Sequence, residues 1–289
     1  MKIRNVLNLF DGISCGRVAL DRIGIAYENY YASEIDKYAI QIAQSNFPDT
    51  IQLGDVKNWR EWNLPQIDLL MGGSPCQGFS ITGKQLNFED PRSKLFFEFV
   101  DILNYYKPKY FLLENVRMKQ EYQDIISDYL GVQPIKINSS LVSAQNRNRL
   151  YWTNIPNISQ PLDKDIILKD VLERDESIEN FINYFDMMKP VNSKSNRVGI
   201  IGKGGQGDRI YTTDKKSVTL MAESGGRGAK TGLYLTGEKT VRMLMPNECE
   251  RLQTLPDNYT EGVSKAQRYK MLGNGWTVDV ITHILNNIK

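Results

Sequence analysis

The first 155 residues alternate between short apolar runs and segments with helical spacing. Apolar or aromatic runs occupy residues 5–10 (NVLNLF), 27–33, 50–53, 67–71 and 110–113. Between and after them, helical spacing occurs at residues 17–23, 37–47, 95–106 and 124–130, and later strands are expected at 132–138 and 149–153. Strands that alternate with helices are typical of βαβ units, so an α/β domain with a sheet covered on both faces is predicted.

The pattern changes after Pro156. Residues from about 186 to 240 hold short segments such as RIYTT, SVTLMA and GLYLT between glycine clusters, which indicates a small irregular β region. Helical patterns return at 246–252, 265–272 and 278–288. We therefore predict a large domain at 1–185, a smaller region at 186–262, and a segment at 263–289 that returns to the first domain.

Composition narrows the class of protein. The chain has 289 residues, of which 41% are hydrophobic and 24% charged, as in ordinary globular proteins. No secretory leader and no run of about eighteen apolar residues is found, so we expect no membrane span and a cytoplasmic protein. Cys15, Cys76 and Cys249 form no Cys-x-x-Cys pair, so neither a disulfide framework nor a metal site is expected. The single histidine, His283, lies in an apolar helical pattern, so a cysteine–histidine nucleophile pair is not expected.

One segment is basic although the net charge is only +2. Residues 187–239 carry ten Lys/Arg against four Asp/Glu, and ten of the 22 glycines. Such a segment is typical of loops that follow phosphates, but a solvated insertion has the same composition. Composition alone leaves both interpretations open.

Residues 72–80 (GGSPCQGFS) place Cys76 in a glycine- and proline-bounded turn after a buried strand. Such turns leave a sheet, so the thiol is expected on a stiff loop at the carboxyl end of a strand. In open α/β sheets, ligands bind at that end.

Acidic residues follow the first three predicted strands: Asp11, Glu34 and Asp55. Carboxylates there would repel a phosphate, and they suit an adenosine-containing cation such as S-adenosylmethionine. Glu34 would bind the ribose and Asp55 the adenine amine, by the logic of dinucleotide-binding folds. The alternative is that these residues only cap the helices that follow.

Further along, Glu114 ends an apolar run (LLENV), and Gln145, Arg147 and Arg149 alternate in SAQNRNR. A carboxylate at the end of an apolar strand loses hydration, and this desolvation cost is expected where the carboxyl group has a function. Alternation in an extended strand would put the three long polar side chains on one face.

Together these motifs resemble the DNA (cytosine-5) methyltransferase family, in its bacterial or phage form. The resemblance rests on Phe10-Asp11-Gly12 with Gly16, Glu34, the Cys76 turn, Glu114-Asn115-Val116, the Gln145/Arg147/Arg149 set, residues 242–259 and Gly273-Asn274, which occur in the family's order over nearly the whole chain. FDGIS, RSKLFFEF and Trp276 are similar to the eukaryotic de novo branch. The resemblance implies a Rossmann-like S-adenosylmethionine-dependent methyltransferase fold with catalytic domain 1–185, a small β-rich target-recognition region 186–262 and a returning segment 263–289.

The resemblance also implies the chemistry. Cys76 would add to C6 of cytosine and make C5 nucleophilic, while Glu114 would contact N3 and the exocyclic amine. Arg149 would bind O2, with Arg147 in support and Gln145 in the same set. After methyl transfer, water would remove the C5 proton and Cys76 would leave.

The resemblance implies two sets of binding residues. The cofactor S-adenosyl-L-methionine, with S-adenosyl-L-homocysteine as product, is assigned to Phe10, Asp11, Gly12, Ile13, Gly16, Glu34, Ile35, Asp55, Val56, Ser74, Pro75, Asn274 and Trp276. DNA contacts are assigned to Gln77, Ser80, Lys84, Arg209, Lys215, Lys216, Arg227 and Lys230. The loop from Gln77 to Lys94 is expected to close over DNA, from which the target base is flipped out. Trp276 would either stack beside the methionine moiety or fill the core, and Cys15 and Cys249 are assigned to packing or to no role.

The expected partner is double-stranded DNA, bound by a monomer without metal or membrane, in a bacterial cell or encoded by a phage. A restriction endonuclease encoded elsewhere would make it half of a restriction–modification pair, and a solitary methylase is equally compatible. Transfer RNA is the alternative substrate, because some relatives methylate it. A non-catalytic binding protein is disfavoured by intact Cys76, Glu114 and Arg149, and an amino-methylating enzyme by the lack of a Pro-Pro-aromatic turn.

Overall fold

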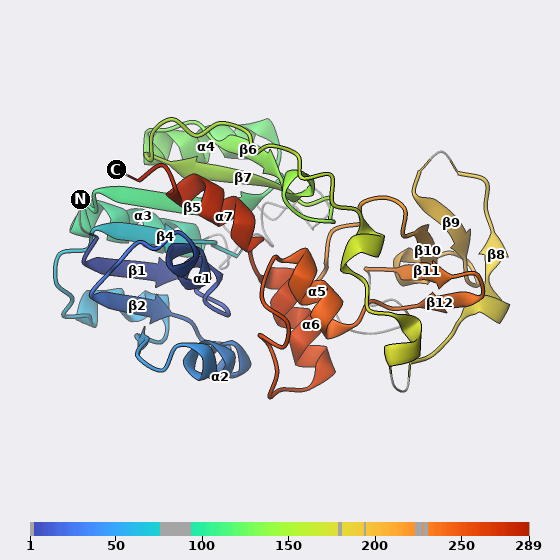
Figure 1. The fold of residues 1–289 in the computed structure, drawn as a ribbon. Helices are drawn as coiled ribbons and strands as arrows, with labels where there is room; N and C mark the ends of the chain where they lie inside the picture. The colour runs from blue at the N-terminus through green and yellow to red at the C-terminus, as the bar shows by residue number, and fades with distance from the viewer. Residues whose placement is uncertain are drawn as a thin grey trace. The chain divides into compact units, whose positions relative to one another are not determined.

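The computed structural model describes residues 3–75, 94–178, 181–193, 195–222, 227 and 231–288. It contains two compact units (Figure 1). The first comprises Met1–Asn138, Asn148–Pro161 and Val280–Lys289, and the second comprises Ser139–Arg147 and Leu162–Asp279. These units are defined by contacts and differ in bounds from the predicted functional domains, which stay a prediction.

The first unit is built on a seven-stranded sheet in the order β3-β2-β1-β4-β5-β7-β6. Its strands are β1 (Asn5–Leu9), β2 (Asn29–Ser33), β3 (Ile51–Gln52), β4 (Leu69–Gly72), β5 (Tyr110–Val116), β6 (Ile135–Asn138) and β7 (Asn148–Thr153). Neighbouring strands from β3 to β5 pair in parallel, and β7 is antiparallel to both β5 and β6. The chain moves outward from β1 through β2 to β3 and then returns to β4 on the other side of β1. The carboxyl ends of β1 and β4 therefore form a switch point, where open α/β sheets bind ligands.

Helices cover both faces of this sheet. They are α1 (Cys15–Arg22), α2 (Lys37–Asn46), α3 (Lys94–Tyr106), α4 (Gln120–Leu130) and α7 (Val278–Leu285), together with the 3-10 helix η1 (Val56–Glu61). Figure 1 shows α1 and α7 over one face, and α3 and α4 over the other. The core on the α3 side includes the fully buried Phe96, Phe99 and Trp152. A Cβ on Gly72 would lie 3.1 Å from the Phe99 ring, so this glycine lets the end of β4 pack closely against α3.

The second unit contains a five-stranded sheet in the order β12-β11-β10-β9-β8. Its elements are η2 (Ser139–Leu141), η3 (Leu168–Val171), η4 (Asp175–Ser177), η5 (Phe185–Met187), β8 (Lys189–Pro190), β9 (Arg197–Ile200), η6 (Gln206–Asp208), β10 (Arg209–Thr212), β11 (Leu233–Gly237), β12 (Thr240–Arg242), α5 (Pro246–Leu252) and α6 (Lys265–Asn274). One small core cluster next to this sheet is Ile201, Ile210, Leu233 and Val241. The mixed α/β architecture with a small β-rich region confirms the predicted fold class.

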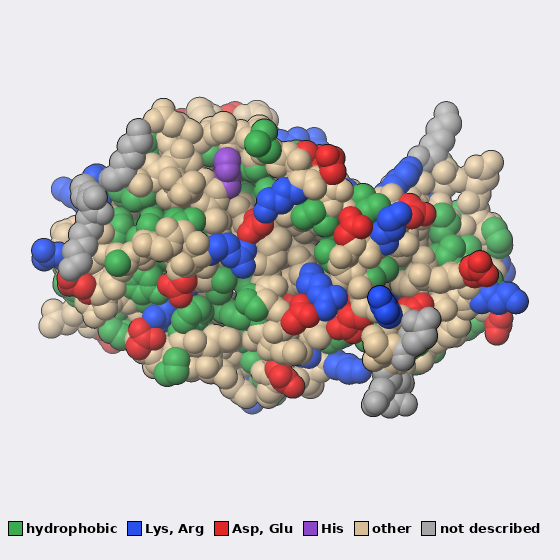
Figure 2. All heavy atoms as spheres, viewed as in Figure 1, with side chains coloured by type: hydrophobic (Ala, Val, Ile, Leu, Met, Phe, Trp, Pro, Cys, Tyr) green, Lys and Arg blue, Asp and Glu red, His purple; other side chains and the backbone are tan. Residues whose placement is uncertain are grey.

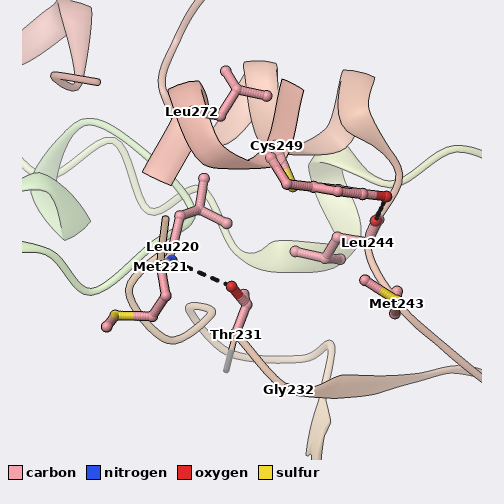
Figure 3. Close-up of a pocket in the computed structure, with 9 residues that line it drawn as sticks. Leu220, Met221, Thr231, Gly232, Met243, Leu244, Cys249 and Leu272 are labelled. Atoms are coloured by element: carbon pink, nitrogen blue, oxygen red, sulfur yellow. Dashed lines mark hydrogen bonds between the residues drawn. The ribbon is translucent and has the colours of Figure 1, made fainter. Parts of the chain in front are cut away.

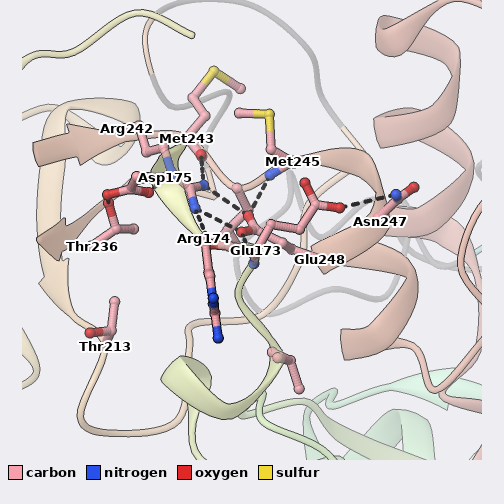
Figure 4. A network of polar contacts seen from close by, with 12 residues as sticks. Glu173, Arg174, Asp175, Thr213, Thr236, Arg242, Met243, Met245, Asn247 and Glu248 are labelled. Atoms are coloured by element: carbon pink, nitrogen blue, oxygen red, sulfur yellow. Dashed lines mark hydrogen bonds and ion pairs between the residues drawn. The ribbon is translucent and has the colours of Figure 1, made fainter. Parts of the chain in front are cut away.

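A buried ion-pair network connects three elements of the second unit (Figure 4). The Arg242 side chain is 0% exposed, and its Nη2 lies 2.8 Å from Oε1 of the equally buried Glu248 at the start of α5. Its Nε lies 2.8 Å from Oδ1 of Asp175 in η4. Glu248 also accepts the backbone N–H of Glu173 and Met245. Buried charges need such partners, so the network specifies how β12, α5 and η4 pack.

In the part of the chain that the structure describes, no helix combines the length and apolar character needed to cross a membrane. Nor do three or more His, Cys, Asp or Glu residues in that part come together in a way that could hold a metal ion. Basic and acidic side chains are interspersed on the face shown in Figure 2, and His283 (purple) reaches the surface there. Its Nε2 lies 2.8 Å from the Ser159 carbonyl oxygen.

Candidate active site

The turn after β1 is wound tightly and is bonded to Glu34. Phe10, Gly12 and Ser14 all have φ near +60° (57°, 60° and 60°), a region that costs energy for residues with a side chain. The Gly12 N–H donates to Glu34 Oε2 at 2.8 Å. Strain held at the carboxyl end of a strand by a neighbouring carboxylate is typical of a functional turn.

Glu34 is fixed at the end of β2 by backbone donors. Its Oε1 accepts the N–H groups of Ile35 and Asp36 at 2.7 Å and 2.8 Å. Beside it the Ile35 side chain is 73% exposed, although it is large and apolar. A fixed carboxylate next to an exposed apolar side chain suits a ligand with a ribose and a flat apolar ring, so these residues fit the adenosine part of S-adenosylmethionine.

Asp55, after β3, caps η1. Its Oδ1 accepts the Lys57 N–H at 3.0 Å, as the capping alternative expects. The neighbouring Val56 is 4% exposed and packs in the core. Capping engages one carboxylate oxygen, so it is compatible with a ligand contact through the other.

The structure corrects the interpretation of Asp11. Asp11 as a residue is 6% exposed, and its carboxyl group accepts hydrogen bonds from Asn8 Nδ2, Tyr30 Oη and Ser14 Oγ. Burial raises the pKa of Asp11 to about 6, against the lowering effect of these donors. The expectation that three carboxylates face a ligand is therefore wrong for Asp11, because this side chain turns inward and holds the β1 turn together.

Two more residues of the predicted cofactor set are buried next to this turn. Ile13 is 1% exposed, and Gly16 lies buried in α1. The next residue of α1, Arg17, donates to Asp49 at 2.6 Å, and its guanidinium lies over the rings of Tyr30 and Phe47. This arginine is not among the predicted site residues, although a charged residue inside an apolar helical pattern is a signal that could have pointed to it.

The carboxyl ends of β4 and β5 lie at the same edge of the sheet. These strands are parallel, with Gly72 opposite Leu113, so Ser74 and Asn115 follow at equivalent heights. Asn115 is 1% exposed, and its Nδ2 donates to Ser74 Oγ at 3.2 Å. Its Oδ1 accepts the Val116 N–H at 2.8 Å. Asn115, which the sequence analysis gave no role, thus fixes the chain two residues before position 76.

Five predicted site residues lie outside the described residues: Cys76, Gln77, Ser80, Lys84 and Lys230. Pro75, the last described residue before Cys76, is half-buried. The predicted closing loop, up to the start of α3, lies outside the described residues as well.

Glu114 and Arg149 form an ion pair on neighbouring antiparallel strands. Arg149 Nε lies 2.9 Å from Glu114 Oε1, and the two side chains are only 13% and 12% exposed. The register pairs Val116 with Arg149 and Glu114 with Tyr151, so the ion pair runs diagonally between β5 and β7. The pair lies at the carboxyl end of β5, next to the Ser74–Asn115 contact.

Gln145 and Arg147 do not share a strand with Arg149, so the predicted common face is wrong. The strand β7 begins only at Asn148, and Gln145 instead forms an isolated parallel bridge with Ser217. Their side chains are 0% and 2% exposed. They hydrogen-bond to residues of the second unit, whereas Arg149 pairs with Glu114 in the first.

A family model described as "C-5 cytosine-specific DNA methylase" matches residues 4–289. The chain belongs to this family. The type II methyltransferase M.HhaI of Haemophilus parahaemolyticus is 35% identical over 308 residues, which cover 98% of this chain and 93% of the relative. The type II methyltransferase M1.ScrFI of Lactococcus lactis subsp. cremoris is 30% identical over 301 residues, covering 96% of this chain and 75% of the relative.

The fold of this DNA methylase is also found among solved structures. The Entamoeba histolytica methyltransferase EhMeth superposes with a TM-score of 0.76 at 22% identity, over 99% of this chain and 98% of its own. The predicted family, the enzyme class of DNA (cytosine-5) methyltransferase and the methyltransferase fold are confirmed.

Two predicted cofactor residues of the methylase belong to the second unit. Asn274 is the exposed last residue of α6. Trp276 is 8% exposed, which favours the core-filling alternative for this residue. Cys15 and Cys249 are both buried as thiols, and burial raises the pKa of Cys249 well above its usual value.

The predicted DNA contacts of the methylase differ in how available they are. Lys215 is exposed, and Arg209 is half-buried in β10. Arg227 pairs with Asp208 at 2.8 Å. Lys216 donates to the carbonyl oxygens of Ser140 and Ser143 at 2.6 Å and 3.3 Å, and only 18% of its side chain is exposed. Lys216 is therefore less available for a phosphate contact than Lys215, because its ammonium group already binds carbonyl groups of its own unit.

The second unit of the methylase also contains a small pocket that is partly open to solvent (Figure 3). Its lining is mostly apolar: Leu220, Met221, Thr231, Gly232, Met243, Leu244, Cys249, Tyr269 and Leu272. The Thr231 hydroxyl accepts the Met221 N–H at 3.2 Å and Tyr269 donates to the Leu244 carbonyl at 2.8 Å. The lining polar groups thus bind neighbouring backbone.

Proposed function

We propose that this protein transfers a methyl group from S-adenosyl-L-methionine to C5 of a cytosine flipped out of a specific duplex DNA sequence, through a transient bond between Cys76 and C6. The observation that carries the proposal is the Glu114–Arg149 ion pair, which lies at the sheet edge where Asn115 holds Ser74, two residues before Cys76. The carboxyl ends of β4 and β5 would then bring together the nucleophile Cys76, the proton donor Glu114 and the cation Arg149.

The ion pair suits one edge of cytosine. The ring nitrogen N3 and the exocyclic oxygen O2 are both bonded to C2 of cytosine, and the two charged groups are 2.9 Å apart. Arg149 would donate to O2, while Glu114 would give a proton to N3 and accept from the exocyclic amine. Thymine carries a proton at N3 and an oxygen in place of the amine, so the same groups would reject it.

Cys76, Glu114 and Arg149 can together carry the bond changes and proton transfers of the covalent step. The Cys76 thiolate adds to C6, and the π electrons of the C5–C6 double bond shift toward N3 and O2. Glu114 protonates N3, and Arg149 stabilises the charge on O2. C5 would then take the methyl group, and the S–CH3 bond of the donor would break to leave S-adenosyl-L-homocysteine. Water removes the C5 proton, the C6–S bond breaks, N3 returns its proton to Glu114, and the thiolate is regenerated with 5-methylcytosine.

The fixed carboxylates support the cofactor assignment. Glu34 would bind the ribose hydroxyls, Ile35 would pack against the adenine, and Asp55 would accept from its amine. S-adenosylmethionine, when bound there, supplies an electrophilic methyl group. Because Asp11 is turned inward, the electrostatic preference for this cation over a phosphate ligand comes from Glu34 and Asp55.

Duplex DNA as substrate requires base flipping, since C6 and C5 of a stacked cytosine cannot be enclosed by Cys76, Glu114 and Arg149 together. Flipping costs a few kcal/mol, which phosphate and base contacts of the 186–262 region would offset. Lys215, Arg209 and Arg227 are the described candidates for those contacts.

The covalent mechanism is tested by Cys76→Ser, with Cys249→Ser as the matched control. Labelled methyl incorporation into duplex DNA should disappear in the first variant and persist in the second. A duplex with 5-fluorocytosine at the target should form an irreversible adduct with the wild-type protein in the presence of the methyl donor. Full methylation by Cys76→Ser would refute the mechanism.

The transfer RNA alternative is tested in the same assay. Incorporation into duplex DNA and into transfer RNA is compared at equal cytosine concentration. A clear preference for transfer RNA would overturn the DNA assignment. Sequencing of methylated cytosines in DNA from expressing cells then gives the target sequence.

A further inference from the structure

We propose that Gln145 and Arg147 are positioning residues, which fix the segment 217–222 to the ends of α5 and α6 and thereby set the target sequence. This inference rests on the proposed function, because it takes the 186–262 region as the part that reads DNA. It assigns to these two residues a role other than the catalytic one that the sequence motif implied.

The segment 217–222 is held along its backbone by the residues before β7. Ser217 pairs with Gln145, with Ser217 N–H donating to the Ala144 carbonyl at 2.7 Å and Asn146 N–H donating to the Ser217 carbonyl at 2.9 Å. Both backbone polar groups of Leu220 are bound by side chains. Its N–H donates to Gln145 Oε1 at 3.4 Å, and its carbonyl accepts from Arg147 Nη1 at 3.2 Å.

The same two side chains also hold the ends of the two helices. Gln145 Nε2 donates to the Leu252 carbonyl at the end of α5, at 2.7 Å. Arg147 Nη2 donates to the carbonyl groups of Gly273 and Gly275 at the end of α6, at 3.1 Å and 2.9 Å. The buried Gln253 reinforces this connection, because its Nε2 donates to the Leu272 carbonyl at 2.6 Å.

Burial makes the arrangement specific. Gln145 and Gln253 are 0% exposed and Arg147 is 2% exposed. A buried donor or acceptor that loses its partner carries the full cost of desolvation, so the segment cannot shift by one residue without leaving several such groups unpaired. A single register is therefore strongly favoured.

Gly273 provides an independent sign that the segment must lie where it does. A Cβ at this position would come within 2.3 Å of both the Ala222 nitrogen and the Met221 carbonyl carbon. These are backbone atoms, which cannot move aside without displacing the segment. Two unrelated features, a buried polar network and a glycine contact, thus fix the same stretch of chain.

The position of this segment matters for recognition because of what adjoins it. Lys215 precedes it and is exposed, and Arg227 follows it in the basic, glycine-rich region. Contacts from irregular loops discriminate bases only if the backbone beneath them is fixed to within fractions of an ångström. If the segment were loosened, the basic region would still attract DNA phosphates, but it would no longer discriminate the target sequence from other sequences.

The test uses Arg147→Lys and Gly273→Ala in the full-length protein, with Arg251→Lys as control. Arg251 is an arginine of the same unit that binds the Val171 carbonyl and the Asp257 carboxylate. We expect KM for target DNA to rise about 10-fold in both test variants, with a similar fall in the preference for target over a single-mismatch duplex. We expect kcat at saturating DNA to stay within about 2-fold of wild type, and the control to match wild type.

Amide hydrogen exchange gives a readout independent of methylation. We expect exchange at Leu220 and Ser217 to accelerate at least about 10-fold in both test variants, while amides of β5 keep their protection. A fall in kcat with unchanged KM, discrimination and exchange would overturn the proposal and place Arg147 in the chemistry. Unchanged exchange alone would also overturn it. Failure of the proposed function is distinguishable, because the wild-type protein itself would then incorporate no methyl group.

Discussion

The buried carboxyl group of Asp11 should make the protein less stable as the pH rises. Its pKa is raised from 3.8 to about 6, chiefly because the group is buried. The folded state therefore holds this proton more tightly than the unfolded state does. The stabilisation is complete below about pH 4 and is lost as the pH rises through about 6. A shift of about two pH units corresponds to about 3 kcal/mol.

Asp11→Asn removes this titration while keeping an oxygen that can accept from Asn8 and Tyr30. The free energy of unfolding is measured by urea denaturation for variant and wild type at each pH. The difference, variant minus wild type, should rise by about 3 kcal/mol between about pH 4 and pH 7.5. Other titrating groups cancel in this difference.

Two results would contradict this account of Asp11. A difference that stays constant with pH would mean that the carboxyl group ionises as it does in water. A difference of the opposite sign would mean that the donors Tyr30, Ser14 and Asn8 outweigh burial and lower the pKa.

Three further substitutions test the site and its support. Glu34→Gln should weaken S-adenosylmethionine binding at least about 10-fold by calorimetry, because one charge-assisted acceptor is lost; unchanged affinity would exclude the ribose role. Asn115→Ala should lower the single-turnover methylation rate about 10-fold with cofactor affinity unchanged, because the chain before Cys76 is released; a normal rate would show that Ser74 needs no such support. Glu248→Ala should cost about 3–5 kcal/mol of unfolding free energy, because the buried Arg242 loses one of its two carboxylate partners and the N–H groups of Glu173 and Met245 lose their acceptor; a loss below about 1 kcal/mol, as for a surface pair, would refute that.

The alternation of strands and helices in the first unit could be predicted because each element carries its own period. Residues 37–47 were expected to be helical, and α2 spans Lys37–Asn46. The predicted strand 110–113 was too short, since β5 continues to Val116. The apolar run ends at Leu113, but the strand does not, because pairing with β7 supplies hydrogen bonds that the local pattern does not encode.

Side-chain direction was less predictable than element type. Asp11, Glu34 and Asp55 all follow strands, yet the first faces inward, the second binds three backbone N–H groups, and the third caps η1. Lys215 and Lys216 are adjacent, yet one is exposed and the other binds carbonyl groups of residues more than seventy positions away. Direction depends on these distant partners, and a single sequence does not reveal them.

The stretch from Gln145 to Arg149 shows why a motif can be recognised correctly and still be misinterpreted. Alternation alone assigned its three long side chains to one face and one task. In the structure the strand starts at Asn148, so Arg149 pairs across the sheet with Glu114. Arg147 instead binds carbonyl groups 73 and 126 residues further along the chain. Five residues of extended chain therefore serve two parts of the molecule: Arg149 supports the proposed chemistry, and Gln145 with Arg147 supports the proposed reading of DNA. A substitution of Arg149 should affect the methylation rate, and one of Arg147 should affect discrimination between DNA sequences, although only Asn148 separates them.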